Sequence, residues 1–146
     1  MLSVILPSAL LSLFLWPLGA LAFRLPPIVS LAFIGRFSST PLAVAQVSRL
    51  GGDSKLTVVL VVVTGIVVVI FERQIRWCCR VKEDDFLAVG LLFGVTSGAI
   101  GATGLHNAGQ KRAAAIASLT FALFGTVLLI AIGIPPVATY VRGLIV

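Results

Sequence analysis

The sequence predicts an all-α integral membrane protein with about four transmembrane elements, two of them discontinuous helices in a repeated arrangement. Two observations lead to this fold class. Hydrophobic residues make up 59% of the 146-residue chain and charged residues only 11%, and the mean hydropathy is +1.15, which is unusual for a soluble protein. In addition, four long blocks contain no Lys, Arg, Asp, Glu or His, namely residues 2–23, 56–71, 86–105 and 113–134.

The four blocks have lengths that suit membrane-crossing helices. As α-helices they reach about 33, 24, 30 and 33 Å, against a hydrocarbon core of about 30 Å. The block 56–71 is short, but Lys55 before it and Glu72 and Arg73 after it have side chains that reach toward the membrane surface. We therefore expect a multi-pass protein of a cell or organelle membrane, with the lipid bilayer as its main partner.

The first block has an alternative interpretation, in which residues 1–22 are a cleaved signal peptide. Residues 20–22 (Ala-Leu-Ala) show the small-x-small pattern of a signal-peptidase site after an apolar stretch. However, no Lys or Arg precedes the block, which is also longer than the usual apolar core of a signal peptide and contains Pro7 and Pro17. A membrane span is the preferred interpretation.

The chain is interpreted as one transmembrane domain over residues 1–146, in which a similar unit occurs twice. Each unit has a segment interrupted by Gly, Ser, Thr or Pro and then a continuous aliphatic span. The predicted parts are a first span (1–23), a broken segment plus span (24–71), a loop with basic and acidic residues (72–85), a broken span plus span (86–134) and a C-terminal tail (135–146). Interrupted segments at corresponding positions of two repeats indicate the binding site of a transporter.

The first interruption separates two apolar stretches that are each too short to cross a membrane. Residues 27–35 (PIVSLAFIG) and 41–47 (PLAVAQV) flank the polar residues 36–40 (RFSST). We expect two half-helices, with Ser39 or Thr40 as the N-cap of the second and a proline in its first turn. Such a break is tolerated in a membrane only where it is buried in protein or faces an aqueous cavity.

The second interruption lies within the block 86–105, where hydroxyl and glycine residues are dense. We expect a helix that opens midway but still crosses the membrane. This would place the loops 72–85 and 106–112 on opposite membrane faces. Gly90 and Gly94 have the GxxxG spacing and are assigned to close helix packing.

Two motifs resemble those of the LrgB-like membrane family, which includes bacterial antiholin-like proteins and the plastid glycolate/glycerate translocator. One is SSTPLA at residues 38–43, preceded by a basic residue, and the other is GLLFGVTSGAIG at residues 90–101. The resemblance covers nearly the whole chain and corresponds to the C-terminal portion of the family domain. Three features depart from the family pattern. Its His after the serine is Gly98 here, its Lys before the hydroxyl run is Arg36, and its G-T-A-R is Gly-Ala-Thr-Gly at residues 101–104.

The resemblance implies a membrane carrier that translocates a small organic anion such as glycolate or glycerate. An alternative from the same family is a holin-like or antiholin-like protein that regulates permeability or murein hydrolase export. A third alternative is an incomplete, inactive fragment that needs a missing N-terminal membrane portion. The expected partners are therefore a small carboxylate and either further copies of the chain or that missing portion.

Arg36 and a set of hydroxyl residues are the candidates for substrate binding. A cation beside a broken helix can pair with a carboxylate, while N–H groups of the following half-helix complete an anion site. The alternative for Arg36 is an anchor at the membrane interface, and for the hydroxyls a role as helix caps. The hydroxyl candidates are Ser38, Ser39, Thr40, Thr96, Ser97 and Thr103.

Several other classes of function lack support in the sequence. The acidic residues lie outside the apolar blocks and His106 is the only histidine, so we expect neither an enzyme nor a metal or cofactor site. The net charge of +6 comes from basic residues at segment ends, where the bilayer explains them better than nucleic acid does. Cys78 and Cys79 are adjacent, which argues against a disulfide framework. Basic residues are nearly balanced between the two expected faces, so the orientation stays open.

Overall fold

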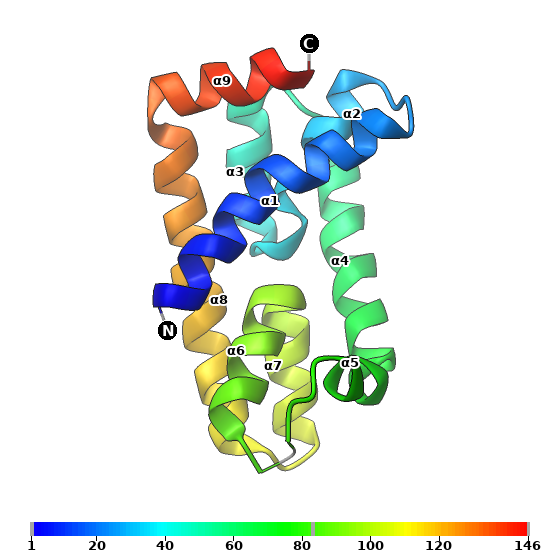
Figure 1. Cartoon of the computed structure of the whole chain (residues 1–146), viewed down its shortest axis with the longest axis vertical. Coiled ribbons are helices and arrows are strands. Elements are labelled where there is room, and N and C mark those ends of the chain that lie inside the picture. Colours follow the sequence, from blue (N-terminus) through cyan, green and yellow to red (C-terminus); the bar gives the residue numbers. More distant parts are fainter. Residues whose placement is uncertain (1, 83, 146) are drawn as a thin grey trace.

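The computed structural model describes residues 2–82 and 84–145 and is entirely helical and turn-like there, with no strand in this part of the chain (Figure 1). The all-α fold class is confirmed. Residues 1, 83 and 146, which belong to the predicted first span, loop and tail, lie outside the described residues. The elements are α1 (Leu2–Ala22), α2 (Pro27–Ala32), η1 (Ile34–Phe37), α3 (Thr40–Leu50), α4 (Ser54–Ile70), α5 (Glu72–Cys78), α6 (Phe86–Thr96), α7 (Gly98–Asn107), α8 (Lys111–Gly133) and α9 (Pro135–Ile145).

The helices α2 and α3 form a helical hairpin, which we call the first hairpin (residues 27–50). The segment after α3 lies beside the start of α2. The backbone N–H of Asp53 donates there to the carbonyl of Ile28 at 3.2 Å. The two arms of the hairpin pack closely at the end opposite its tip, where a methyl group added at Gly52 would lie 2.9 Å from Leu31 Cβ. The polar stretch 36–40 therefore forms the tip of the hairpin.

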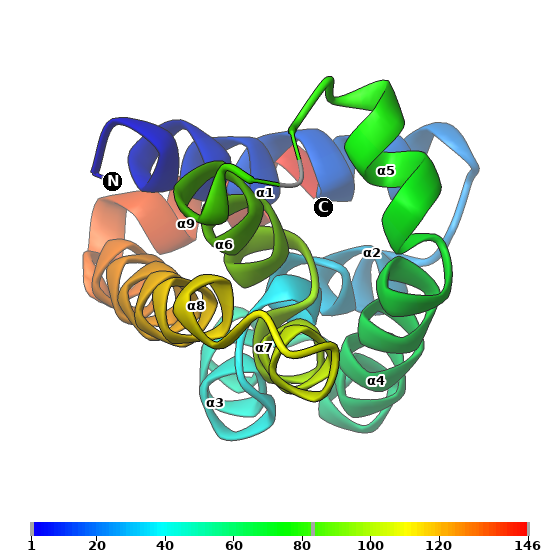
Figure 2. The same ribbon diagram turned by 90° about the horizontal axis from the view of Figure 1, so that it is seen from below.

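The helices α6 and α7 form a second hairpin (residues 86–107). Helix α6 runs alongside α8, and a methyl group added at Gly90 or Gly94 would lie 2.8 or 2.7 Å from a backbone carbonyl of α8. Ser97 ends α6 with φ −122°, and Gly98 has φ +58°, a left-handed conformation that favours glycine. The chain reverses there, and α7 runs back against both α8 and α4 (Figure 2).

The two hairpins point toward each other from opposite ends of the molecule (Figure 1). Their tips meet near the middle, where a methyl group added at Gly98 would lie 3.9 Å from the carbonyl oxygen of Phe37. Each hairpin is followed by a long helix, α4 after the first and α8 after the second, and these helices run in opposite directions. A helix of ten or eleven residues is about 15 Å long, so each hairpin has the depth of half a hydrocarbon core.

The predicted placement of the loops 72–85 and 106–112 at opposite ends is wrong. The guanidinium of Arg76 donates to the side-chain oxygen of Gln110 at 3.1 Å, which places both loops at the same end of the molecule. The error has a physical origin, because an apolar block of about 20 residues is long enough for one full crossing or for two half-crossings. The reversal at Gly98 decides between them.

We predict that Cys78 and a cysteine introduced at Asn107 react with an impermeant thiol reagent from the same membrane side. Both positions are exposed, and the shared end of the molecule follows from the hairpin. Single-cysteine variants reconstituted in vesicles measure this, with Lys55→Cys as the control that reacts only from the other side. Labelling of Asn107→Cys from the side of Lys55→Cys would contradict the hairpin.

The predicted count of four spans and the two predicted discontinuous spans are not confirmed. Among the described residues, α8 is the one helix that is long and apolar enough to cross a membrane, with 23 residues and a mean hydropathy of 2.4 in its best window. Helices α4 and α5 are long and apolar enough to cross a membrane only when they are taken together, and they are bent by 74° relative to each other at Phe71. Glu72 and Arg76 form a salt bridge within α5.

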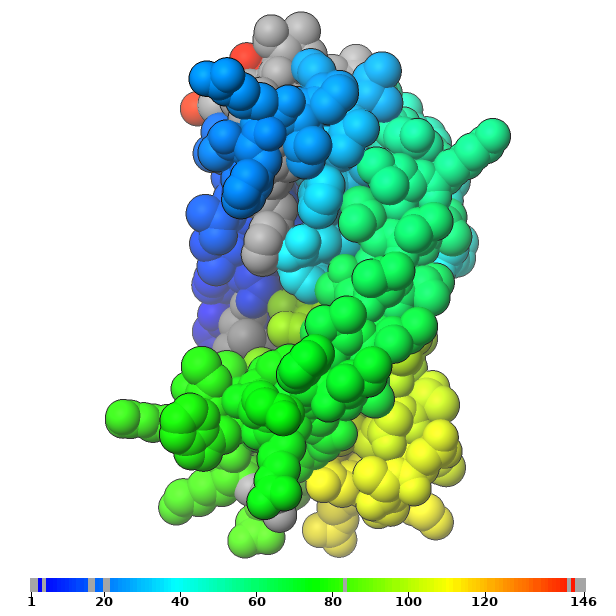
Figure 3. All heavy atoms as spheres, turned by 90° about the vertical axis from the view of Figure 1, so that its right-hand side faces the viewer, coloured from blue at the N-terminus to red at the C-terminus, as the bar shows by residue number. Residues whose placement is uncertain are grey.

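Helix α4 presents apolar side chains to the surface along most of its length. In the space-filling view it forms a ridge that leads down to α5 (Figure 3). The exposed members are Val59, Val62, Val63, Ile66, Val67 and Ile70. An apolar surface of this extent is unfavourable in water and is typical of contact with lipid or with another protein.

Candidate anion site at the hairpin tips

A cavity of about 350 Å³ lies between the tips of the two hairpins. This volume is at the lower end of the range of small-molecule pockets. The first tip, α4 and the second tip each form part of its wall. The lining residues are Arg36, Phe37, Ser38, Ser39, Thr40, Pro41, Val61, Val62, Ser97, Gly98, Ala99 and Ile100.

The first tip is built by a 3-10 turn that gives way to an extended residue and then to α3. The backbone N–H of Ser38 donates to the carbonyl of Gly35 at 2.9 Å, which closes the turn. Ser39 is the N-cap of α3, with φ −66° and ψ 147°, so one of the two predicted cap positions is correct. Its side chain makes no cap hydrogen bond. From the first turn of α3, Thr40 and Pro41 line the cavity. The N–H of Thr40 has no acceptor within the helix, whereas Pro41 has no N–H.

Arg36 is half-buried on the inner side of this tip. Its guanidinium carbon lies 4.5 Å from the ring centroid of Phe37 and 5.8 Å from that of Phe33, within the range of cation–π attraction. The turn is packed closely on its other side, since a methyl group added at Gly35 would lie 3.1 Å from Thr57 Cγ2. The aromatic rings and this packing hold the cation at the wall of the cavity.

The second tip places another helix N-terminus at the same cavity. Helix α7 begins at Gly98, directly after Ser97, so its first-turn N–H groups also lie at the tip. The Ser97 hydroxyl donates to the carbonyl of Phe93 at 2.8 Å, which leaves its oxygen available as an acceptor.

The two helix N-termini and one arginine give the cavity a positive electrostatic character. The N-terminus of a helix carries a partial positive charge, and α3 and α7 both begin at this cavity while running in opposite directions. None of the described residues that line the cavity is acidic. Chemically, the arrangement suits a small anion whose oxygens accept hydrogen bonds.

A protein-family model provides the decisive comparison. The model of the LrgB-like family matches residues 1–138. The chain belongs to the LrgB-like family. The resemblance seen in the motifs is therefore confirmed, and the chain is a member of a membrane-protein family that is not known for enzymatic activity. No curated protein and no solved structure matches the chain.

The two motifs of this LrgB-like protein map onto the two hairpin tips. Residues 38–43 form the end of the first tip and the start of α3, and residues 90–101 form most of α6, the reversal and the start of α7. Gly90 and Gly94 lie where α6 approaches α8 most closely. The motif residues thus shape the cavity and the close contact of helices behind it.

The cavity brings together five of the seven candidate binding residues. These are Arg36, Ser38, Ser39, Thr40 and Ser97. The other two, Thr96 and Thr103, are not among its lining residues. Thr96 donates to the carbonyl of Leu92 at 2.7 Å, and Thr103 donates to that of Ala99 at 2.9 Å.

Gln46 is a buried polar residue that our sequence analysis did not single out. Its side-chain N–H₂ group donates to the hydroxyl of Ser38 at 3.3 Å and to the carbonyl of Gly125 in α8 at 3.1 Å. The amide therefore connects the first tip to α8. A lone amide within an otherwise apolar half-helix was the available signal, because a polar group inside a membrane needs a partner.

Proposed function

We propose that this LrgB-like protein is a carrier for a small organic anion of the glycolate or glycerate kind. The carboxylate binds in the cavity between the hairpin tips. The observation that carries the proposal is the convergence of Arg36 and two opposed helix N-termini on one cavity without an acidic side chain. The motif resemblance suggests the class of substrate. The positive groups at the cavity are the reason to expect that the substrate is an anion.

The binding mode follows from the available donors. Arg36 offers paired N–H groups that match the two oxygens of a carboxylate, and the N–H of Thr40 in α3 and the first-turn N–H groups of α7 complete the site. The hydroxyls of Ser39 and Thr40 are placed to meet a hydroxyl group of the substrate, since both residues line the cavity.

The opposed hairpins suit a mechanism of alternating access. In this proposal α4 and α8 cross the bilayer, and the two hairpins enter it halfway from opposite sides. A site at both tips then lies near the midplane, as in carriers built from inverted repeats. Movement of the first hairpin opens the site to one side, and movement of the second opens it to the other.

A holin-like or antiholin-like assembly is the second candidate, and one observation favours it. The exposed apolar ridge of α4 offers a surface on which further copies can pack. A chain that functions only with an additional membrane portion is the third candidate. In the holin-like or antiholin-like assembly the cavity has no role in binding a substrate. In the third candidate the cavity is only part of the binding site.

Uptake by reconstituted vesicles tests the proposal. We expect saturable uptake of labelled glycolate or D-glycerate, with weaker competition by L-glycerate, because a carrier holds its substrate in a defined geometry. Vesicles without protein provide the background. Uptake that rises linearly with concentration and admits unrelated solutes would instead support a permeability function.

A further inference from the structure

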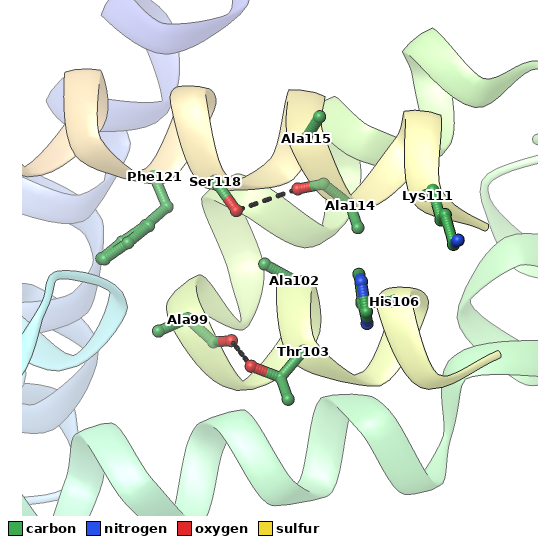
Figure 4. Close-up of a pocket in the computed structure, with 9 residues that line it drawn as sticks. All are labelled: Ala99, Ala102, Thr103, His106, Lys111, Ala114, Ala115, Ser118 and Phe121. Atoms are coloured by element: carbon green, nitrogen blue, oxygen red, sulfur yellow. Dashed lines mark hydrogen bonds between the residues drawn. The ribbon is translucent and has the colours of Figure 1, made fainter. Parts of the chain in front are cut away.

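A second cavity of about 480 Å³ forms a groove between α7 and α8 (Figure 4). Figure 4 shows His106 and Lys111 at one end of this groove and Phe121 at the other. The walls between the ends are small, with Ala99 and Ala102 on α7 and other alanines on α8.

The groove has the length of one membrane leaflet. From Lys111 to Phe121 along α8 is about 15 Å, which is half of a hydrocarbon core of about 30 Å. Its outer end lies beside the turn that joins α7 and α8, and its inner end lies near the hairpin tip, where a methyl group added at Gly98 would be 3.5 Å from the Phe121 ring. The groove thus runs from one end of the molecule to its middle.

The walls are suited to a hydrocarbon chain. The two wall hydroxyls are satisfied within their own helices, since Thr103 donates to the carbonyl of Ala99 and Ser118 donates to that of Ala114, both at 2.9 Å (Figure 4). The alanine side chains provide only methyl groups. Water in such a groove would find few donors, whereas methylene groups would make favourable contacts.

The outer end carries positive charge. Lys111 is exposed in the first turn of α8, and His106 is exposed in the last turn of α7. The partial positive charge of the α8 N-terminus is opposed by the partial negative charge of the α7 C-terminus beside it, so the positive charge of this end comes from Lys111. None of the described residues that line the groove is acidic, although Asp84 lies on another side of Lys111, in a neighbouring cavity.

We propose that the groove between α7 and α8 binds an anionic phospholipid. One acyl chain lies along the alanine walls as far as Phe121, and the phosphate of the headgroup is held by Lys111 and His106. The match of leaflet length, apolar walls and a cationic outer end carries this proposal, which is independent of the transport proposal.

A bound lipid would lie directly against the second hairpin. Ala99 lines both the groove and the cavity at the tips, so the inner end of the acyl chain is separated from the anion site by a single turn of α7. The lipid would therefore stabilise the position of α7 against α8.

Native mass spectrometry of the purified full chain tests the lipid site. We expect preferential retention of phosphatidylglycerol over phosphatidylcholine, and a loss of that preference of about fivefold in Lys111→Gln, as for one cation at a membrane surface. Lys55→Gln, which removes an exposed lysine at the other end, is the matched control. Ala115→Leu fills the groove and should lower retention by a similar factor, whereas Ala122→Leu, also exposed on α8 but outside the groove, should not.

Any one of four results would overturn the lipid proposal. Equal retention of both lipids would show that the cationic end selects nothing, and equal effects of the two alanine variants would show that the groove is not the site. In membranes, fast reaction of Ser118→Cys with a water-soluble thiol reagent would indicate a water-filled path, and disulfide formation between copies through that cysteine would indicate a second copy of the chain in the groove.

Discussion

Replacing Arg36 by Gln is expected to abolish saturable uptake of glycolate or glycerate while membrane insertion is preserved. In the proposed site the guanidinium provides charge-assisted hydrogen bonds to the carboxylate, and each such bond contributes about 1.5–3 kcal/mol. Loss of one bond therefore weakens binding by about 10- to 150-fold, and loss of the charge removes the main attraction for the anion. Uptake by vesicles that contain equal amounts of each variant measures the effect.

The variant Arg36→Lys should retain part of the uptake. Lysine keeps the positive charge but lacks the planar pair of donors that matches a carboxylate. The control is Lys55→Gln, which removes an exposed cation far from the cavity and should transport normally. Normal uptake by Arg36→Gln, with equal insertion of all variants, would show that Arg36 is only an anchor at the membrane interface. The hydroxyls and helix N-termini would then remain as the candidate binding groups.

The positions of the two hairpin tips could be predicted from the sequence. Each tip coincides with an interruption of an apolar stretch by hydroxyl, glycine or proline residues, at 36–40 and at Ser97 with Gly98. Polar residues of this kind are expensive in lipid unless they line a cavity or satisfy the backbone. Composition therefore locates the interruption between two helices.

The direction of the chain after each break could not be predicted in the same way. The block 86–105 has a length that suits one crossing, and the reversal depends on a single left-handed residue, Gly98. The bend between α4 and α5 at Phe71 is likewise absent from the apolar pattern, which ends at the same residue with or without a bend. By contrast, the last block, 113–134, agrees with α8 to within two residues at each end.

The candidate hydroxyls divide according to local backbone structure. Ser39, Thr40 and Ser97 lie next to the starts of α3 and α7 and line the cavity. Thr96, at the end of α6, and Thr103, inside α7, do not line it, and both donate to the carbonyl four residues earlier. Such back-bonding is common for Ser and Thr within helices. A hydroxyl-rich stretch thus identifies the neighbourhood of a site, while the exact helix boundary decides which hydroxyls face it.

If the two hairpin tips share one anion site, a bound anion should protect cysteines on both tips from modification. Ser39→Cys places a thiol on the first tip and Ser97→Cys places one on the second, each in a background without Cys78 and Cys79. Both serines line the same cavity, so a bound carboxylate should exclude a small thiol reagent from either position.

We expect saturating glycolate or glycerate to slow the modification of both thiols by about tenfold, which corresponds to occupancy of about 90% of the sites. Glycerol, which has the hydroxyls but no carboxylate, should not protect, and adding Arg36→Gln should remove the protection from both positions together. Protection of only one thiol, or of neither, would contradict a shared anion site at the hairpin tips.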